Sequence, residues 1–145
     1  MDDVRAVPNQ VNLVVRDMDA AVAFYERLGA AVLPAEPPWD RHHRTVTTPD
    51  GLDFDLDSTE FAGQWNEGWM DGRVGAVLGF GVSSRGAVDA VYADLIEAGH
   101  TGEQPPYDAF WGARYAVVRD PDGNSVGIKS PIDPDRRTTP PTPGV

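Results

Sequence analysis

The same pattern of apolar residues occurs twice in this chain, and the repeat limits the possible folds more than any other feature. In the first half the pattern runs through Val11, Leu13, Val15, Ala21, Phe24, Tyr25 and Leu28. Each position has an apolar counterpart 67 residues later, in the series Leu78, Phe80, Val82, Val88, Val91, Tyr92 and Leu95. Such internal similarity indicates a chain built from two copies of one structural unit.

Each copy begins with a strand and continues with a helix. The alternating apolar residues have the period of a strand, and the i, i+3, i+4, i+7 spacing that follows has the period of a helix. Asp17 and Ser84 are residues that favour helix N-caps, and Gly29 and Gly99 are placed to end the helices. Further strand-like segments follow both helices, at about 30–34, 41–48 and 52–58 and at about 100–104, 113–119 and 125–130.

These elements predict an α+β fold of two tandem βαβββ modules, at about residues 8–60 and 74–131. With 145 residues in all, we assign both modules to a single domain over residues 1–132. The remaining segment, 133–145, is rich in proline and threonine and is predicted to be a disordered tail.

Composition excludes several classes of function. A formal charge of −11 argues against nucleic acid binding, and the absence of cysteine excludes disulfides, thiolate metal sites and cysteine nucleophiles. No apolar run approaches the length of a membrane span, and the first ten residues do not have the pattern of a signal peptide, so we expect a cytoplasmic protein without a membrane partner. The negative charge serves either solubility or the attraction of a cationic small molecule.

Two motifs add a resemblance to a known family. The stretch VNLVVRDMDAAVAFYERLG opens the first module and RYAVVRDPDGNSVGI closes the second. A repeated strand–helix–three-strand module with these motifs, over about residues 8–131, resembles the vicinal-oxygen-chelate superfamily, which includes glyoxalase I, extradiol dioxygenases, and bleomycin and fosfomycin resistance proteins. The resemblance implies a curled mixed sheet around a shared cavity, in a homodimer whose two chains commonly contribute to each site.

The resemblance also implies where a metal would bind. Metal-using members place four ligands on the cavity side of four strands, and the matching positions here are Gln10, Asp55, Val77 and Gly127. Valine and glycine have no side-chain donor atom, so only Gln10 and Asp55 remain as metal-ligand candidates, with His42 or His43 as neighbouring donors. We therefore predict no metal and no cofactor.

Acidic residues alternate with apolar ones in GLDFDLDS, residues 51–58. Successive strand residues point to opposite faces, so Asp53, Asp55 and Asp57 share one side, which faces either solvent or, as the resemblance implies, the cavity. The same alternation would turn Val77, Gly79 and Gly81 toward the cavity. Glycines on one face indicate either space kept for a ligand or tight packing between the modules.

The aromatic residues of the predicted loops are the other candidates for a binding site. Trp39, Trp65, Trp69, Phe110 and Trp111 lie outside the two predicted helices, where they could stack on a flat ligand or anchor a dimer interface. His42 and His43 are adjacent, so only one of them faces the cavity, and we take His42 as the candidate. Arg114 could hold an acidic or carbonyl group of a ligand, or form a surface salt bridge.

Together these features predict a metal-free protein that sequesters an aromatic natural product or antibiotic, as the drug-binding resistance members of the family do. The predicted ligand-binding residues are Trp39, His42, Asp53, Asp55, Asp57, Trp65, Trp69, Phe110, Trp111 and Arg114. One alternative is a lyase or isomerase of the glyoxalase or dioxygenase type, acting on a small substrate with an atypical or absent metal site. Another is a partner-binding module with tryptophan anchors.

Overall fold

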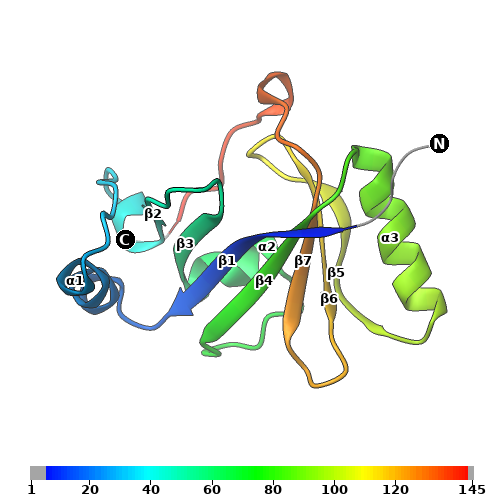
Figure 1. The fold of residues 1–145 in the computed structure, drawn as a ribbon, viewed down its shortest axis with the longest axis horizontal. Helices are drawn as coiled ribbons and strands as arrows, with labels where there is room; N and C mark the ends of the chain where they lie inside the picture. The colour runs from blue at the N-terminus through cyan, green and yellow to red at the C-terminus, as the bar shows by residue number, and fades with distance from the viewer. Residues whose placement is uncertain (1–5, 144–145) are drawn as a thin grey trace.

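Within residues 6–143, seven strands form one curled sheet in the order β2-β3-β1-β4-β7-β6-β5 (Figure 1). The computed structural model describes residues 6–143. The strands are β1 (Val7–Val15), β2 (His43–Val46), β3 (Asp53–Ser58), β4 (Gly75–Gly81), β5 (Thr101–Asp108), β6 (Arg114–Arg119) and β7 (Ser125–Lys129). The helices are α1 (Met18–Leu28), α2 (Thr59–Trp65) and α3 (Arg85–Glu97), with 3-10 turns η1 (Trp39–Arg41) and η2 (Pro134–Arg136).

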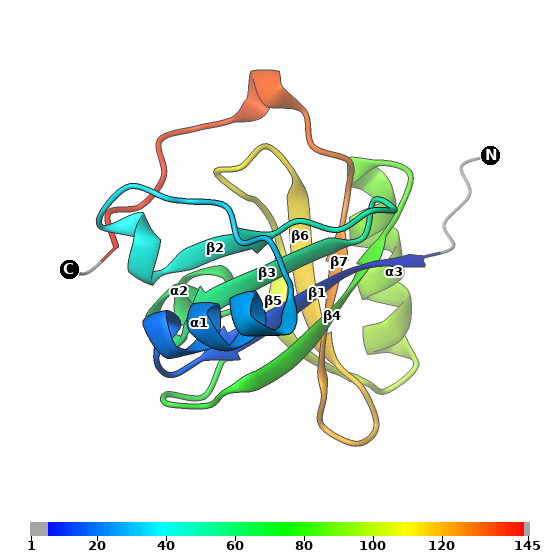
Figure 2. The same cartoon turned by 60° about the vertical axis from the view of Figure 1, so that its left-hand side comes forward.

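The two modules meet edge to edge at the centre of the sheet. Strands β1 and β4 pair antiparallel, with Val11 opposite Leu78, and these two residues are also counterparts in the sequence repeat. The approximate two-fold relation between the modules therefore passes through this pair. On either side, β3 pairs parallel to β1 and β7 pairs parallel to β4. The predicted α+β class and curled mixed sheet are confirmed (Figure 2).

Each long helix covers the outer face of its own module. Met18 and Val22 of α1 pack on Leu56 of β3, and Val88 of α3 packs with Ile128 of β7. Both predicted N-caps are present, because the side chain of Asp17 accepts a hydrogen bond from the amide of Ala20 and that of Ser84 from Ala87.

Several apolar residues expected to face a helix or the core are exposed in the chain. Phe24 and Leu28 of α1 are 62% and 75% exposed, since Met18 and Val22 form the buried face instead. Leu78 is half exposed and lies at the junction of the modules, where it pairs with Val11.

Two predicted segments differ from the structure. The first-module strand at 30–34 is reduced to a single bridge between Val32 and Val46. The region 61–72, read as a loop, begins inside α2, which Ser58 caps by accepting a hydrogen bond from the amide of Phe61. With seven residues, α2 is too short to show a helical period in the sequence.

Residues 133–143, for which the sequence predicts a disordered tail, follow a hydrogen-bonded path in the structure; residues 144 and 145 lie outside the described residues. The amide of Asp133 donates to the carbonyl of Gly112 at 2.9 Å, and that of Thr138 to the carbonyl of Phe110 at 3.0 Å. The prolines that argued against burial also restrict the unfolded chain, which lowers the entropy cost of a fixed path. We call residues 130–143 the C-terminal strap.

Gly112 makes the docking of the strap possible. Its φ of 96° is unfavourable for other residues, and a side chain there would collide with the carbonyl oxygen of Asp133.

Within residues 6–143, the structure contains no helix with the length and apolar character needed to cross a membrane.

Candidate functional site

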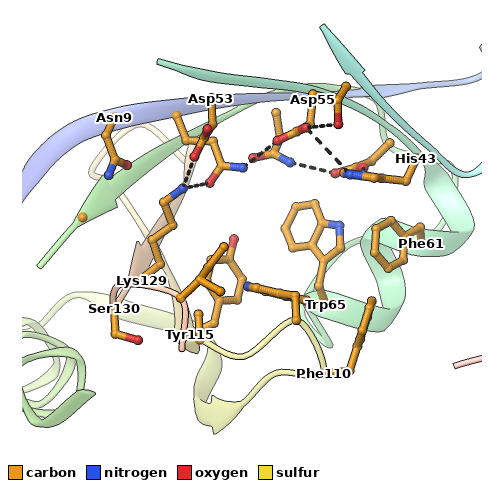
Figure 3. Close-up of a pocket in the computed structure, with 18 of the residues that line it drawn as sticks. Asn9, His43, Asp53, Asp55, Phe61, Trp65, Phe110, Tyr115, Lys129 and Ser130 are labelled. Atoms are coloured by element: carbon orange, nitrogen blue, oxygen red, sulfur yellow. Dashed lines mark hydrogen bonds and ion pairs between the residues drawn. The ribbon is translucent and has the colours of Figure 1, made fainter. Parts of the chain in front are cut away.

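A cavity of about 820 Å³ lies between the first-module strands, helix α2, the 109–113 loop and the C-terminal strap (Figure 3). One side, which we call the acidic floor, consists of strand side chains: Gln10, Asn12, His43, Thr45, Asp53, Asp55 and Asp57. The opposite side, which we call the aromatic wall, consists of Trp39, Phe61, Trp65, Phe110, Trp111 and Tyr115.

The aspartate row of β3 faces the cavity and not bulk solvent. Leu56 is fully buried against α1, so the pleat turns its neighbours Asp55 and Asp57 to the opposite, concave side. Those two aspartates are 8% and 1% exposed, whereas Asp53, at the start of the strand, is more accessible.

Neighbouring strands supply hydrogen-bond partners for the two buried aspartates. Asp57 lies 2.6 Å from Nδ1 of His43 and accepts a 2.7 Å hydrogen bond from Nδ2 of Asn12. Asp55 accepts hydrogen bonds from Nε2 of Gln10 at 2.8 Å and from the hydroxyl of Thr45 at 3.2 Å. The second imidazole nitrogen of His43 is 3.7 Å from Asp55, so the histidine lies between two carboxylates.

The environment raises the pKa of both His43 and Asp55. Burial alone would lower the pKa of His43, but the hydrogen bond to Asp57 and the charges of both aspartates outweigh it. For Asp55, burial is the main cause of a raised pKa; the nearby Asp57 adds to it, and the charge of His43 opposes it. The ionised form of Asp55 therefore costs stability in the folded protein.

Replacing Asp55 with asparagine tests that cost. A carboxyl group with a raised folded-state pKa stabilises the fold when protonated, and this contribution is lost as the pH rises through that pKa. We expect Asp55→Asn to raise the free energy of unfolding by roughly 0.5–1 kcal/mol at pH 8, with the gain shrinking toward pH 4. Urea denaturation across this range measures it, and a variant less stable than the parent at pH 8 would contradict the assignment.

Lys129 is the only lysine of the chain, and its side chain crosses from the second module to the floor of the first. Its ammonium nitrogen lies 2.6 Å from Oε1 of Gln10 and 3.0 Å from Oδ2 of Asp53. Lys129 was not among the site residues predicted from the sequence. A usable signal was present, because Lys129 is two positions after the inward-facing Gly127 and so shares its face.

The four positions that the family resemblance assigns to a metal do not fit one here. Val77 is buried in an apolar cluster, and Gly127 is covered by the hydroxyl of Tyr115, which a side chain there would approach to 2.6 Å. Both amide atoms of Gln10 are engaged, by Lys129 and Asp55. Across residues 6–143 no three His, Asp or Glu side chains are grouped to hold an ion.

The inward glycines of β4 are also covered by side chains. A Cβ at Gly79 would meet the side chain of Gln10 at 2.8 Å, and one at Gly81 would collide with the amide of Asn9. Of the two interpretations left open by the sequence, tight packing between the modules describes these glycines, and the open volume lies above them.

The aromatic wall brings together residues that are far apart in the sequence. Trp39 of η1 meets Phe61 of α2 edge to face, with ring centroids 5.0 Å apart. Phe110 and Trp111 also meet edge to face, at 5.2 Å. Four of the predicted ligand-binding aromatic residues, Trp39, Trp65, Phe110 and Trp111, line the cavity.

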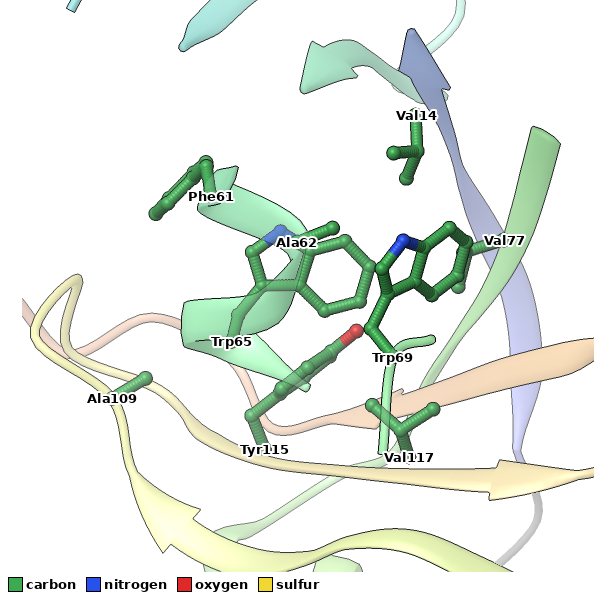
Figure 4. Close-up of a cluster of buried hydrophobic side chains, with 9 residues drawn as sticks. All are labelled: Val14, Phe61, Ala62, Trp65, Trp69, Val77, Ala109, Tyr115 and Val117. Atoms are coloured by element: carbon green, nitrogen blue, oxygen red, sulfur yellow. The ribbon is translucent and has the colours of Figure 1, made fainter. Parts of the chain in front are cut away.

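Three other predicted site residues lie away from the cavity. Trp69 is buried in the apolar cluster of Figure 4 and is covered by Arg73, whose guanidinium lies 4.5 Å from the ring centroid. His42 points to the other face of β2, where Nδ1 lies 2.7 Å from the hydroxyl of Ser58, so His43 is the histidine in the cavity. Arg114 pairs with Asp89 and Asp108, the salt-bridge alternative raised from the sequence.

Two buried polar atoms in the described part of the chain have no hydrogen-bond partner in the protein. They are Oδ1 of Asn9 and Nε1 of Trp65, and both residues line the cavity. A buried polar atom left without a partner costs about 1–3 kcal/mol, so a water molecule or a ligand group that reached either atom would be stabilised by the hydrogen bond it made there.

Comparison with known proteins identifies the family. The model of the Glyoxalase/Bleomycin resistance protein/Dioxygenase superfamily matches residues 7–128. A search of curated proteins found no match.

Solved structures with the same fold differ widely in their described activities. An NAD-dependent benzaldehyde dehydrogenase from Legionella pneumophila is 22% identical with a TM-score of 0.63, over 85% of this chain and 98% of the other. Methylmalonyl-CoA epimerase from Mycobacterium tuberculosis is 19% identical with a TM-score of 0.58, over 88% and 89%. A Mn(II)-bound glyoxalase from Novosphingobium aromaticivorans is 18% identical with a TM-score of 0.57, over 89% and 39%. At these identities the likeness shows the fold alone.

Proposed function

The chain belongs to the Glyoxalase/Bleomycin resistance protein/Dioxygenase superfamily, and we propose that it is a metal-free member that binds and sequesters an aromatic small molecule such as a natural product or antibiotic. The observation that supports this most strongly is the pair of unpartnered polar atoms, Asn9 Oδ1 and Trp65 Nε1, on the lining of one cavity. Water can satisfy them in the free protein, and a ligand with matching polar groups would replace that water.

The two sides of the cavity would recognise different parts of the ligand. Trp39, Phe110 and Trp111 would contact a flat ring system, each aromatic pair adding about 0.5–1.5 kcal/mol beyond the burial of apolar area. The floor has three aspartates against Lys129 and His43, so at least one negative charge remains when all of these groups are ionised. That excess favours a neutral or cationic ligand over an anionic one.

We also propose that the protein forms a homodimer. Phe24 and Leu28 on the outer surface of α1 provide exposed apolar area for such a contact. Light scattering coupled to size-exclusion chromatography measures the mass in solution, and a monomer at micromolar concentration would remove the dimer from the proposal.

One observation supports a second candidate, a metal-free proton transfer enzyme. His43 is held by the buried Asp57 and faces the cavity, the arrangement of a histidine general base. Mass spectrometry of a bound compound after long incubation in D2O separates the two functions, because proton transfer would exchange carbon-bound hydrogen of the ligand for deuterium, whereas a sequestering protein returns its ligand unlabelled.

Tryptophan fluorescence tests the proposed function directly, since Trp39, Trp65 and Trp111 line the cavity. We expect planar aromatic probes, the cation proflavine and the neutral 2-naphthamide, to quench the emission saturably at one site per chain. Absence of saturable quenching by every aromatic compound in a broad panel would reject the proposal.

A further inference from the structure

The ammonium group of Lys129 has one hydrogen-bond donor to spare. An ammonium carries three N–H groups, and in the described part of the chain two acceptors lie within hydrogen-bond distance, Oε1 of Gln10 and Oδ2 of Asp53. The side chain is largely buried and lines the cavity. The remaining N–H is therefore available to an acceptor inside the cavity.

Asn9 supplies a hydrogen-bond acceptor at the same end of the cavity as Lys129. In a regular strand Asn9 and Gln10 would face opposite sides, but the pairing of β1 with β4 shifts by one residue between Pro8 and Gln10, and both side chains line the cavity. The Asn9 amide lies across Gly81, which is the register partner of Lys129. Figure 3 shows Asn9 and Lys129 together at one end, with Ser130 nearby.

The two residues thus present an unused donor and an unpartnered buried acceptor at the same end of the cavity. We propose that Asn9 and Lys129 form a subsite for a carboxamide edge, H–N–C=O, of the aromatic ligand. The carbonyl oxygen of the ligand accepts from Lys129, and its N–H donates to Oδ1 of Asn9. This inference rests on the proposed function and narrows its ligand to aromatic amides, lactams and imides.

Other polar groups fit this subsite less well. A carboxylate has no N–H for Asn9 and would lie close to Asp53, which is 3.0 Å from the ammonium. An amine has no acceptor for Lys129 and would place two cations together. An ester offers the carbonyl oxygen but no N–H. Comparing an ester with the corresponding amide therefore measures the contribution of the ligand N–H to binding.

Calorimetric titration with 2-naphthamide, methyl 2-naphthoate and 2-naphthoate tests the subsite. With the parent protein we expect the amide to bind about fivefold more tightly than the ester, and the carboxylate to bind more weakly than the amide, since one neutral hydrogen bond is worth about 1 kcal/mol. Lys129→Met should weaken the amide and the ester alike, by about tenfold or more. Asn9→Ala should weaken the amide and leave the ester within twofold.

Arg114→Met is the control, because it removes a cation that lies outside the cavity, and it should change none of these dissociation constants.

A second measurement is independent of any substitution. Selective ¹⁵N-lysine labelling gives a single ammonium resonance, since Lys129 is the only lysine. Addition of 2-naphthamide should shift it, and addition of naphthalene should not.

Two results would overturn the subsite while leaving the proposed function intact. One is amide and ester binding with equal affinity, and the other is Lys129→Met leaving both constants unchanged. Tighter binding of 2-naphthoate than of the amide would also reject it, since the N–H of the ligand would then have no role. If no aromatic probe binds at all, the proposed function itself fails.

Discussion

Replacing Glu103 with alanine is expected to lower the free energy of unfolding by about 3–5 kcal/mol. The carboxylate of this β5 residue is 1% exposed and accepts hydrogen bonds from Nη2 of Arg119 at 2.8 Å and from the hydroxyl of Ser125 at 2.5 Å. Asn66, directly after α2, donates to it at 3.2 Å. Alanine would leave the buried side chains of Asn66 and Ser125 without this acceptor, and it would remove the ion-pair partner of the partly exposed Arg119.

An exposed ion pair provides the matched control for Glu103. Asp89→Ala removes a carboxylate that pairs with Arg114 at 2.9 Å but is half exposed, so the expected loss is about 1 kcal/mol or less. Urea denaturation of both variants gives the two values. Comparable losses at the two sites would show that the Glu103 network does not hold the end of α2 to strands β5, β6 and β7.

The second large effect concerns ligand affinity. Trp39→Ala is expected to weaken the binding of 2-naphthamide by about 30-fold, equivalent to about 2 kcal/mol, because a central aromatic residue commonly dominates the energy of such a site. Trp39 lines the cavity and meets both Phe61 and Phe110, at centroid distances of 5.0 and 6.1 Å.

Met70→Ala is the matching control for Trp39, since it removes an exposed apolar side chain that does not line the cavity. The same titration should give a dissociation constant within twofold of the parent value. An equal loss of affinity in both variants, or none in Trp39→Ala, would place the aromatic contact elsewhere.

Much of the fold follows from local patterns that this sequence shows clearly. The repeat predicts two modules, and the structure pairs Val11 with its own counterpart Leu78. The alternation in GLDFDLDS predicts the shared face of the aspartates, because a strand has no other way to arrange them. What the alternation leaves open is whether that face meets solvent, and only the packing of Leu56 against α1 decides it.

The site was harder to predict, because it depends on register and on long-range contacts. His43 lines the cavity because it pairs with Asp57 across β2 and β3, whereas adjacency alone could not choose between His42 and His43. Asn9 reaches the cavity through a shift in strand pairing that its sequence does not signal. The strap depends on carbonyl groups of Gly112 and Phe110, which lie 21 and 28 residues before their partners Asp133 and Thr138, so its own composition predicted disorder.

We propose that this cavity binds an aromatic ligand through the ammonium group of Lys129, and that no metal ion takes part in the binding. The most direct measurement is the calorimetric dissociation constant of 2-naphthamide for protein dialysed against EDTA, compared with the same protein supplied with Mn²⁺. We predict one ligand per chain and constants that agree within twofold. Binding that disappears after EDTA and returns with stoichiometric Mn²⁺ would contradict the claim.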